Sequence, residues 1–311
     1  EMRRDPSVFL MGEEVAEYDG AYKVSKGMLA EFGEKRVIDT PIAELGFTAI
    51  GVGAAMNGLR PIIEYMTWNF AVLASDQIIN HAAKMLQMSG GQFHVPIVFR
   101  GGNGSAGQLA ATHSQSYEAF YGNIPGLKVV TPSTPFDAKG LLKSAIRDDD
   151  PVLVMESERM YGDKGDVPDG EYLVPIGVAD VKRPGTDVTI VSFGKMMKVA
   201  LAAAEELQKE GVNAEVIDLR TIRPLDTATL IASARKTNRI VVVDENFPMM
   251  SVASEIAYRV QKDAFDFLDA PVIRVNQADT PLPFSAPLIE ASLPNPARVI
   301  AAVKEVMYIQ K

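Results

Sequence analysis

Glu44 is the residue whose type and position most suggest chemistry, because it lies in the first turn of a predicted helix that opens at Pro41. Small residues then fill the helix, among them Gly46, Gly51 and Gly53. Glycine inside a helix costs about 1 kcal/mol relative to alanine, so several together need a reason. The pattern predicts either tight helix packing or a subunit interface with a ligand at its edge. A carboxylate in the first turn also interacts favourably with the helix dipole, so Glu44 has a structural alternative.

His113 is the second candidate, and it is one of three histidines in the chain. Histidine titrates near neutral pH and can therefore donate a proton in catalysis. His81 lies on a predicted helix and His94 precedes a predicted strand, and nothing marks either for chemistry. A purely structural role is the alternative for His113.

The stretch before His113 is rich in glycine, which occupies four of the eight positions 100–107. This predicts a flexible loop beside an active site. It is not a phosphate-binding P-loop, because no Gly-Lys-Ser/Thr follows. The chain has no cysteine, which excludes disulfides, thiolate catalysis and Cys-ligated metals.

Ordered motifs along the chain resemble the β-subunit family of the pyruvate dehydrogenase E1 component. The resemblance runs from Gly12-Glu-Glu-Val15 to the C-terminal helix, and a series of motifs is more specific than any one. The family usually has proline where this chain has Gly102. The motifs are Asp39-Thr-Pro-Ile-Ala-Glu44, Gly58-Leu-Arg-Pro61, Glu64-Tyr-Met-Thr-Trp-Asn-Phe70, Met88-Ser-Gly-Gly91, Pro96-Ile-Val-Phe-Arg-Gly101 and His113-Ser-Gln115.

The resemblance implies that the chain binds thiamine diphosphate, with the Glu44 carboxylate hydrogen-bonded to N1′ of the aminopyrimidine ring. Such a charge-assisted bond favours the imino tautomer that deprotonates C2 of the cofactor. Phe70 matches an aromatic residue against this ring, and Ile42 and Met66 match positions lining the same pocket. Ordinary core packing is the alternative for these three. The resemblance assigns His113 as a proton donor when the acyl group passes to a lipoyl group.

The sequence lacks the Gly-Asp-Gly motif with which thiamine enzymes bind Mg²⁺ and the diphosphate. Gly162-Asp-Lys-Gly165 is no substitute, since it lies in a predicted linker without a following helix. The resemblance therefore implies an α2β2 assembly, in which an α subunit supplies this half of the site and the cofactor is shared.

A K⁺ ion, bound largely through backbone carbonyls, is also implied by the resemblance. The matching positions are Ile97, Ala145, Ile146, Asp148 and Asp150. Asp150 stands where asparagine is commoner, a change that a carbonyl ligand tolerates. An acidic helix end on the surface is the alternative.

Docking to the E2 component is a further implication, through the lipoyl and subunit-binding domains of E2. Asp269, within Phe267-Leu-Asp-Ala-Pro271, matches an acidic position implicated in binding the small basic subunit-binding domain. A solvated aspartate before a strand is the alternative.

Composition agrees with a globular protein of 311 residues, 47% hydrophobic and 23% charged. A formal charge of -9 argues against nucleic acid or an anionic membrane as the main partner. No apolar run approaches the roughly 18 residues of a spanning helix. The expected compartment is the cytoplasm, or a mitochondrial matrix or plastid if a targeting segment was removed.

Apolar strand-like runs alternate with helical patterns, which predicts an α/β protein whose two domains each contain a mostly parallel sheet flanked by helices. A pyrimidine-binding domain is expected at 1–185, including a linker at 161–185, and a transketolase C-terminal-like domain at 186–311. Strands are expected at 8–11, 36–39, 61–65, 95–99, 152–155, 187–192, 213–218, 239–244 and 272–275. Helices are expected at 24–32, 41–55, 70–89, 135–147, 195–209, 227–236, 252–267 and 296–307.

The sequence thus predicts the β subunit of a thiamine-dependent 2-oxo acid dehydrogenase that decarboxylates pyruvate and transfers the acetyl group to lipoyl-E2. Acetoin and branched-chain 2-oxo acid enzymes are the rivals within the class, and Tyr65-Met-Thr-Trp-Asn-Phe70 resembles the pyruvate type more. A non-catalytic assembly protein of the same fold is the rival from another class. Intact Glu44 and His113 argue against it.

Overall fold

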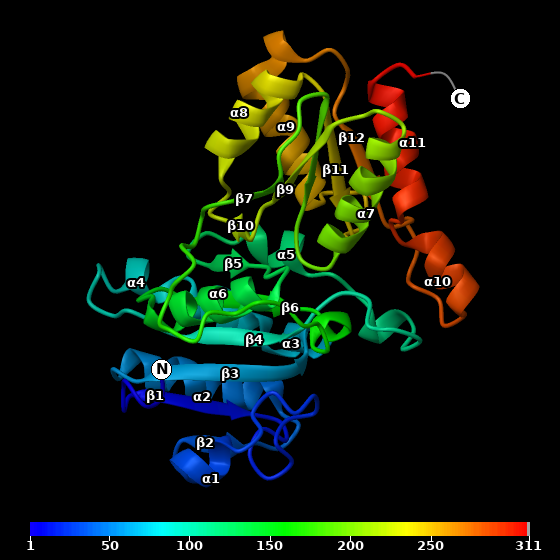
Figure 1. Cartoon of the computed structure of the whole chain (residues 1–311). Coiled ribbons are helices and arrows are strands. Elements are labelled where there is room, and N and C mark those ends of the chain that lie inside the picture. Colours follow the sequence, from blue (N-terminus) through cyan, green and yellow to red (C-terminus); the bar gives the residue numbers. More distant parts are fainter. Residues whose placement is uncertain (310–311) are drawn as a thin grey trace. The chain divides into compact units, whose positions relative to one another are not determined.

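A computed structural model describes residues 1–309 of the chain (Figure 1). The chain divides into two compact units, one formed by Glu1–Ala106 with Phe120–Ile176 and the other by Gly107–Ala119 with the chain from Gly177 onward. Each unit contains a mostly parallel sheet with helices on its faces, so the predicted fold class is confirmed. The chain passes from the first unit to the second after Ile176, nine residues before the predicted boundary at 185. The boundary of the independently folding domain stays a proposal.

The first unit is built on a parallel sheet in the order β5-β6-β4-β3-β1-β2. Its strands are β1 Val8–Gly12, β2 Val37–Asp39, β3 Arg60–Thr67, β4 Val98–Gly102, β5 Lys128–Val130 and β6 Val152–Glu156. Its helices are α1 Met28–Phe32, α2 Glu44–Met56, α3 Trp68–Ala71, η1 Val72–Ala74, η2 Gln77–Ala82, α4 Met85–Met88, α6 Pro135–Arg147 and η4 Glu158–Met160. A further helix, α5 Glu118–Gly122, begins in the second unit and ends in the first.

Alternate residues of the central strands face opposite sides of this sheet. Ile62 on β3 and Val98 on β4 join the core that α6 covers. The next residue, Ile63, faces α2, where Gly51 leaves no room for a side chain because a Cβ there would lie 2.6 Å from the Ile63 side chain. The glycine in α2 therefore serves close helix-to-sheet packing at this position.

The prediction of one continuous α-helix at 70–89 is wrong. The chain forms α3, a 3₁₀ turn (η1), a π-helical stretch (η2) and α4 in succession. A tight stretch followed by a wide one averages to nearly the α-helical period, so apolar spacing could not separate them. The helix expected at 24–32 is also shorter, because Gly27 adopts a left-handed conformation directly before α1.

The second unit is built on a sheet in the order β12-β11-β8-β9-β7. The strands of this sheet are β7 Asp180–Arg183, β8 Val188–Ser192, β9 Ala214–Asp218, β11 Ile240–Asp244 and β12 Ile273–Asn276. The unit also contains the short strand β10 Thr221–Arg223, which is not part of this sheet. Its helices are η3 Ala111–His113, α7 Met196–Lys209, α8 Thr227–Thr237, α9 Val252–Ala264, η5 Phe265–Phe267, α10 Ala286–Ser292 and α11 Pro296–Val306.

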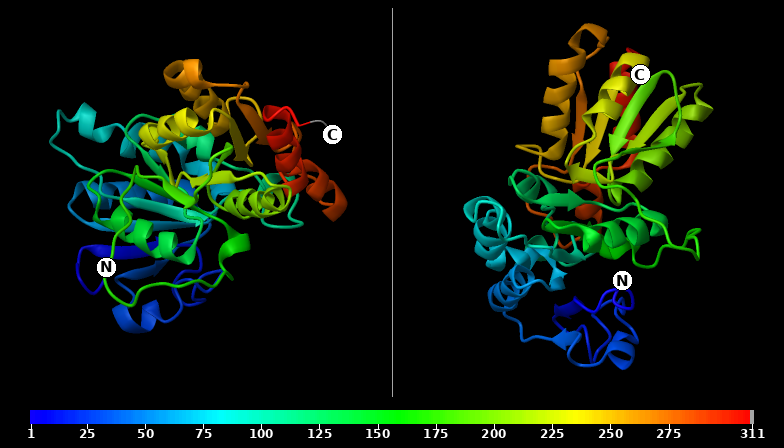
Figure 2. Two further views of the ribbon diagram at one scale, coloured as in Figure 1. Left: turned by 45° about the horizontal axis from the view of Figure 1, so that its top comes forward. Right: turned by 90° about the vertical axis from the view of Figure 1, so that its left-hand side faces the viewer.

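Helices cover both faces of the second sheet. α7 and α11 form a core with β8, β9, β11 and β12 on one face, and α8 and α9 lie on the other (Figures 1 and 2). All five residues of β8 and of β11 are buried, as expected for central parallel strands. Side-chain caps fix helix starts, as when Asn295 accepts a hydrogen bond from the Arg298 amide, 3.0 Å away, at the start of α11.

The predicted linker 161–185 contains a strand that the sequence did not reveal. β7, at Asp180–Arg183, pairs antiparallel with β9 and forms the edge of the second sheet. β7 has one apolar residue, Val181, among three charged ones, so this edge strand lacks the apolar run that marked the central strands. Other short elements were also not expected, namely β5, β10, α5, α10 and the 3₁₀ turns η3 and η4.

Candidate functional site

Glu44 is the first residue of α2 and its side chain is buried, with 5% of the residue exposed. α2 packs against β3 and β1 through Phe47, Thr48, Val52 and neighbours on one face. The packing of that face brings the first turn of the helix to the edge of the sheet. The structure therefore places the Glu44 carboxylate out of water although it is a charged residue, which a purely dipole-stabilising glutamate on a surface helix would not require.

A second carboxylate, Glu13, meets Glu44 and was not singled out from the sequence. It follows β1 directly and is buried. Burial, together with the charge of Glu44 and a side-chain hydrogen bond to it, raises the pKa of Glu13 to about 7. A hydrogen bond between two carboxyl groups requires a proton on one of them, and the raised pKa assigns that proton to Glu13 up to about neutral pH.

Glu13 could have been found from the position of Gly12-Glu-Glu-Val15 at the end of a predicted buried strand. Parallel sheets commonly place ligand-binding groups at the carboxyl ends of their strands. Gly12 itself shows how crowded this edge is, because a Cβ there would collide with the backbone carbonyl of Glu64 on the neighbouring strand.

Aromatic packing fixes the end of β3 and the start of α3. The fully buried Tyr65 stacks near Trp68 and Phe99 and shares a 2.7 Å hydrogen bond with Thr48 on α2. Thr67 then caps α3. Between these buried residues Met66 and Phe70 stay partly exposed, so both can contact a ligand while their backbone is held rigidly.

The carboxyl ends of β3, β4 and β6 are tied together by a buried ion-pair network that the sequence did not indicate. Arg100 binds Glu156 through Nε at 2.7 Å and through Nη2, and it binds Glu64 through Nη1. Tyr161 donates a 2.8 Å hydrogen bond to Glu156. Burial raises the pKa of Glu64 even though Arg100 opposes the shift. One guanidinium thus holds two carboxylates, and the network carries excess negative charge.

The glycine-rich stretch 100–107 is not a mobile loop throughout, contrary to expectation. β4 extends to Gly102, and the amide of Asn103 donates to the Glu156 carbonyl at 2.7 Å. A Cβ at Gly102 would lie 2.7 Å from the Glu158 side chain. A proline at Gly102 would therefore require Glu158, which hydrogen-bonds Tyr22, to move.

His113 ends the short η3 turn in the second unit and is partly exposed. Its Nδ1 lies 3.1 Å from the Thr112 hydroxyl. Although the sequence places it among elements of the first unit, the segment Gly107–Ala119 belongs to the second. Its role as a proton donor stays a prediction.

Ile42 precedes α2 and is 82% exposed in the chain alone. Leu45 and Ile50, on the exposed side of α2, add to an apolar surface near Glu44. Gly46 and Gly53 add no side chain to this side of α2, and a Cβ at Gly53 would meet nothing within 4 Å. Glu44 thus lies beside a surface suited to burial by a ligand or a partner.

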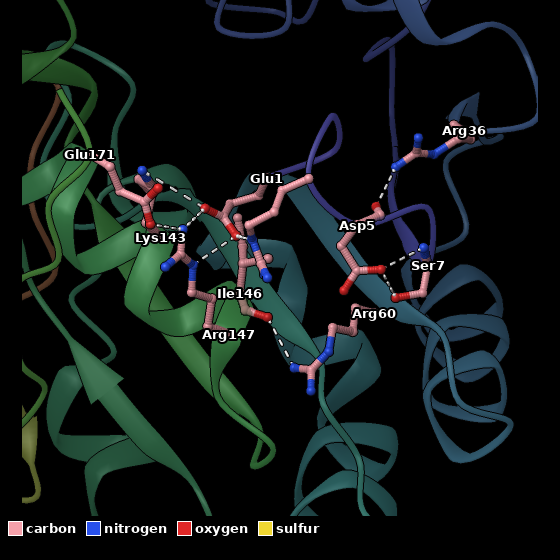
Figure 3. Close-up of polar contacts among 10 residues, drawn as sticks. Glu1, Asp5, Ser7, Arg36, Arg60, Lys143, Ile146, Arg147 and Glu171 are labelled. Atoms are coloured by element: carbon pink, nitrogen blue, oxygen red, sulfur yellow. Dashed lines mark hydrogen bonds and ion pairs between the residues drawn. The ribbon is translucent and has the colours of Figure 1, made fainter. Parts of the chain in front are cut away.

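At the expected K⁺ site, the cationic side chains of Arg60 and Lys128 already contact several of the five residues. Arg60 donates to the carbonyls of Ile146 at 3.1 Å and Asp148 at 2.9 Å, and Figure 3 shows the bond to Ile146. Lys128 pairs with the carboxylates of Asp148 and Asp150 at 2.7 and 3.0 Å.

The remaining carbonyls of that set also accept backbone hydrogen bonds. The Val152 amide donates to the Ile97 carbonyl at 3.0 Å, and the Asp148 amide donates to the Ala145 carbonyl at 3.2 Å. Each carbonyl has a second lone pair, so a K⁺ ion fits this set only beside two fixed cationic side chains. The K⁺ site stays a prediction.

Asp269 pairs with Arg239 at 2.7 Å, and its carbonyl accepts a 3.0 Å hydrogen bond from the Tyr308 hydroxyl. Its carboxylate is half-exposed. A docking partner would meet this aspartate already paired within the chain, so its role in docking stays a prediction.

Within residues 1–309, no cluster of three or more His, Cys, Asp or Glu side chains could hold a metal ion. In the same part of the chain, every helix is too short or too polar to cross a membrane.

Two family models cover most of the chain. Residues 1–164 match the transketolase pyrimidine-binding domain, and residues 177–299 match the transketolase C-terminal domain. The chain is also 57% identical over 309 residues to the pyruvate dehydrogenase E1 component subunit beta of Rhizobium meliloti (strain 1021), covering 99% of this chain and 67% of the relative. The chain belongs to the pyruvate dehydrogenase E1 β-subunit family.

Other E1 β subunits are similar over almost the whole chain. The mitochondrial subunit beta-1 of Oryza sativa subsp. japonica is 55% identical, with coverage of 99% of this chain and 83% of the relative. The subunit beta of Rickettsia felis (strain ATCC VR-1525 / URRWXCal2) is 55% identical, with coverage of 99% and 94%. These relatives are bacterial and mitochondrial, and they confirm the predicted family and its pyruvate type.

A solved structure of a split-gene transketolase, an inactive β4 tetramer, has the same fold. The TM-score is 0.79 at 22% identity, over 99% of this chain and 94% of that chain. At this identity the likeness concerns the fold alone.

Proposed function

We propose that this E1 β-type chain forms an α2β2 enzyme with an α subunit, and that the enzyme decarboxylates pyruvate and transfers the acetyl group to a lipoyl group on E2. The observation that carries the proposal is the buried Glu44 carboxylate at the start of α2, beside the buried Glu13 whose pKa it helps to raise. The identity to E1 β subunits supports pyruvate as the substrate.

Thiamine diphosphate fits the residues of the first unit on its aminopyrimidine side. Glu44 offers a buried carboxylate to hydrogen-bond a ring nitrogen, and Met66 and Phe70 offer partly exposed apolar surface beside a rigid backbone. When bound, the cofactor supplies a nucleophilic carbon that attacks the 2-oxo group. The part of this chain is to orient the ring through a hydrogen bond at the Glu44 carboxylate, which lies beside the buried Glu13.

The α subunit is proposed to bind the diphosphate and Mg²⁺, because the sequence has no Gly-Asp-Gly motif. The exposed apolar residues Ile42, Leu45 and Ile50 would then be buried by cofactor and neighbouring subunits. His113 is proposed to donate the proton during acetyl transfer, and Asp269 to contact the basic binding domain of E2.

Reconstitution with the α subunit tests the proposal. The purified chain alone should bind thiamine diphosphate and Mg²⁺ weakly in calorimetry, and the mixture with α should bind both and release CO₂ from pyruvate. Pyruvate should be used in preference to branched-chain 2-oxo acids and acetoin. Micromolar binding of the cofactor by this chain alone would contradict the half-site. Preference for another substrate would contradict the pyruvate assignment while leaving the half-site intact.

A further inference from the structure

The second sheet changes winding direction between β8 and β11, since β9 lies on the other side of β8. Open α/β sheets commonly bind ligands in the crevice outside the carboxyl ends of strands at such a point. Here Lys195, which follows β8, pairs with Glu245, which follows β11, at 2.8 Å. Glu245 and the next residue, Asn246, are both buried. The chain's own segment 107–119, which carries His113, contacts this edge.

Asn246 makes that contact from a fixed position. Its Nδ2 donates to Asp244 Oδ1 at 2.7 Å and to Glu118 Oε2 at 3.4 Å. Its backbone amide also donates to Asp244 at 2.8 Å, and its carbonyl accepts from Asn276 Nδ2 at 3.0 Å. Because both partners of the side-chain amide are carboxylates, the nitrogen rather than the oxygen must face them. Glu118 is 8% exposed and Asn246 4% exposed, so the contact is shielded from water.

A second contact holds the other end of the segment. Gln108 Nε2 donates to the Phe284 carbonyl at 3.2 Å, just before α10. Gln108 and Glu118 lie five residues before and after His113. The two bonds therefore bracket the histidine symmetrically along the chain, and both reach residues of the C-terminal part of the chain.

The backbone between Gln108 and Glu118 is strained at Ala110. Ala110 has φ 63° and ψ -169°, a region that residues other than glycine rarely occupy. Such a conformation persists only where surrounding contacts determine it. Ser114, next to His113, is buried, which fixes the segment on the far side of the histidine as well.

We propose that Asn246 and Gln108 are positioning residues, which hold the His113 segment in one conformation by binding Glu118 and the Phe284 carbonyl. The functional part of this inference rests on the proposed role of His113 in acetyl transfer. The part of the second unit from Gly177 onward thereby contributes to a catalytic step by fixing the backbone around the histidine.

The structural test is hydrogen exchange of the backbone amides at 109–117 in the full chain. Asn246→Ala and Gln108→Ala should each speed exchange there about tenfold or more, because each variant removes one of the bonds that local opening must break. Glu118→Ala should act like Asn246→Ala while leaving the bonds between Asn246 and Asp244 in place, which covers the case in which Asn246→Ala folds poorly. The matched control is Asn213→Ala, an asparagine of the same unit whose amide binds Thr186 instead. Unchanged exchange in both Gln108→Ala and Glu118→Ala would overturn the proposal.

The functional test uses the reconstituted α2β2 enzyme. Asn246→Ala should slow acetyl transfer to a lipoyl domain about tenfold and affect decarboxylation with an artificial electron acceptor much less. In a His113→Ala background Asn246→Ala should add no further loss, whereas an additional loss of the same size would show a general structural role and overturn the positioning role. If His113→Ala alone leaves acetyl transfer intact, the role proposed for His113 fails, and the exchange measurement still decides whether the segment is held.

Discussion

Two buried acidic clusters at the edge of the first sheet differ in how their charge is compensated. Glu64 and Glu156 share the guanidinium of Arg100, which joins three neighbouring strands. Glu13 and Glu44 instead face each other, and the result is a pKa of about 7 for Glu13. Arg100 opposes the rise in the pKa of Glu64 that burial causes, whereas the charge of Glu44 adds to the rise in the pKa of Glu13. We therefore expect the loss of Arg100 to affect mainly stability and the loss of the Glu44 carboxylate to affect mainly activity.

The largest effect is expected from Arg100→Met. Removing the guanidinium leaves two buried carboxylates without their cation, which should destabilise the chain by about 3–5 kcal/mol. The urea unfolding midpoint of the purified chain measures this change. Arg60→Met is the matched control, because Arg60 is more exposed and binds carbonyls and the exposed Asp149. Similar midpoints for both variants would mean that the network around Arg100 does not hold the strand ends.

Glu44→Gln should lower turnover of the reconstituted enzyme on the order of 100-fold, since an amide cannot share the proton. Assembly should change little, because glutamine has nearly the same shape. Steady-state CO₂ release from pyruvate measures the turnover. The control is Glu255→Gln, a change at an exposed first-turn glutamate of α9. Near-normal turnover of Glu44→Gln would reject its catalytic role.

Glu13→Gln should change how stability depends on pH. The folded chain raises the pKa of Glu13 from 4.5 to about 7, so folded Glu13 holds its proton where the unfolded chain has lost it. Stability of the unaltered chain should therefore fall as pH rises from about 4.5 to 7, and then stay lower. The variant lacks this titration and should be more stable above pH 7 by about 1–2 kcal/mol, allowing for solvent screening.

Thermal unfolding of the two chains across pH 4.5–8 measures the effect of Glu13→Gln. Parallel curves for the two chains would show that folding does not raise the pKa of Glu13. Such a result would remove the contrast with the Arg100 network.

Asp269→Ala should have the smallest effect, a few-fold weaker binding to the E2 subunit-binding domain. Arg239 already pairs with this carboxylate, so a new partner gains little additional charge interaction. Binding should weaken with added salt, and activity with an artificial acceptor should stay unchanged. Isothermal titration at low salt, with Asp266→Ala as a neighbouring control, measures the affinity. Equal affinity of Asp269→Ala and the unaltered chain would remove it from the docking surface.

Much of the architecture followed from the sequence because central parallel strands and amphipathic helices leave strong local patterns. The runs at 187–192 and 239–244 correspond to β8 and β11, and the spacing at 195–209 corresponds to α7. Those patterns record burial on a strand or a helix face, which is the property that decides these elements. β7 lacked such a pattern, and the 70–89 segment kept the average period of an α-helix while its turns varied.

The sequence by itself determined the family, the α/β class and the candidate status of Glu44, because ordered motifs and periodicity are local properties. Only the tertiary structure brought Glu13 to Glu44, Arg100 to two glutamates and Asn246 to the segment of His113. Each of these contacts joins residues that are distant in sequence, and the pKa of Glu13 rises only when folding removes water and sets it beside Glu44. The pKa of Glu13 is thus a property of the fold, and no spacing along the chain encodes it.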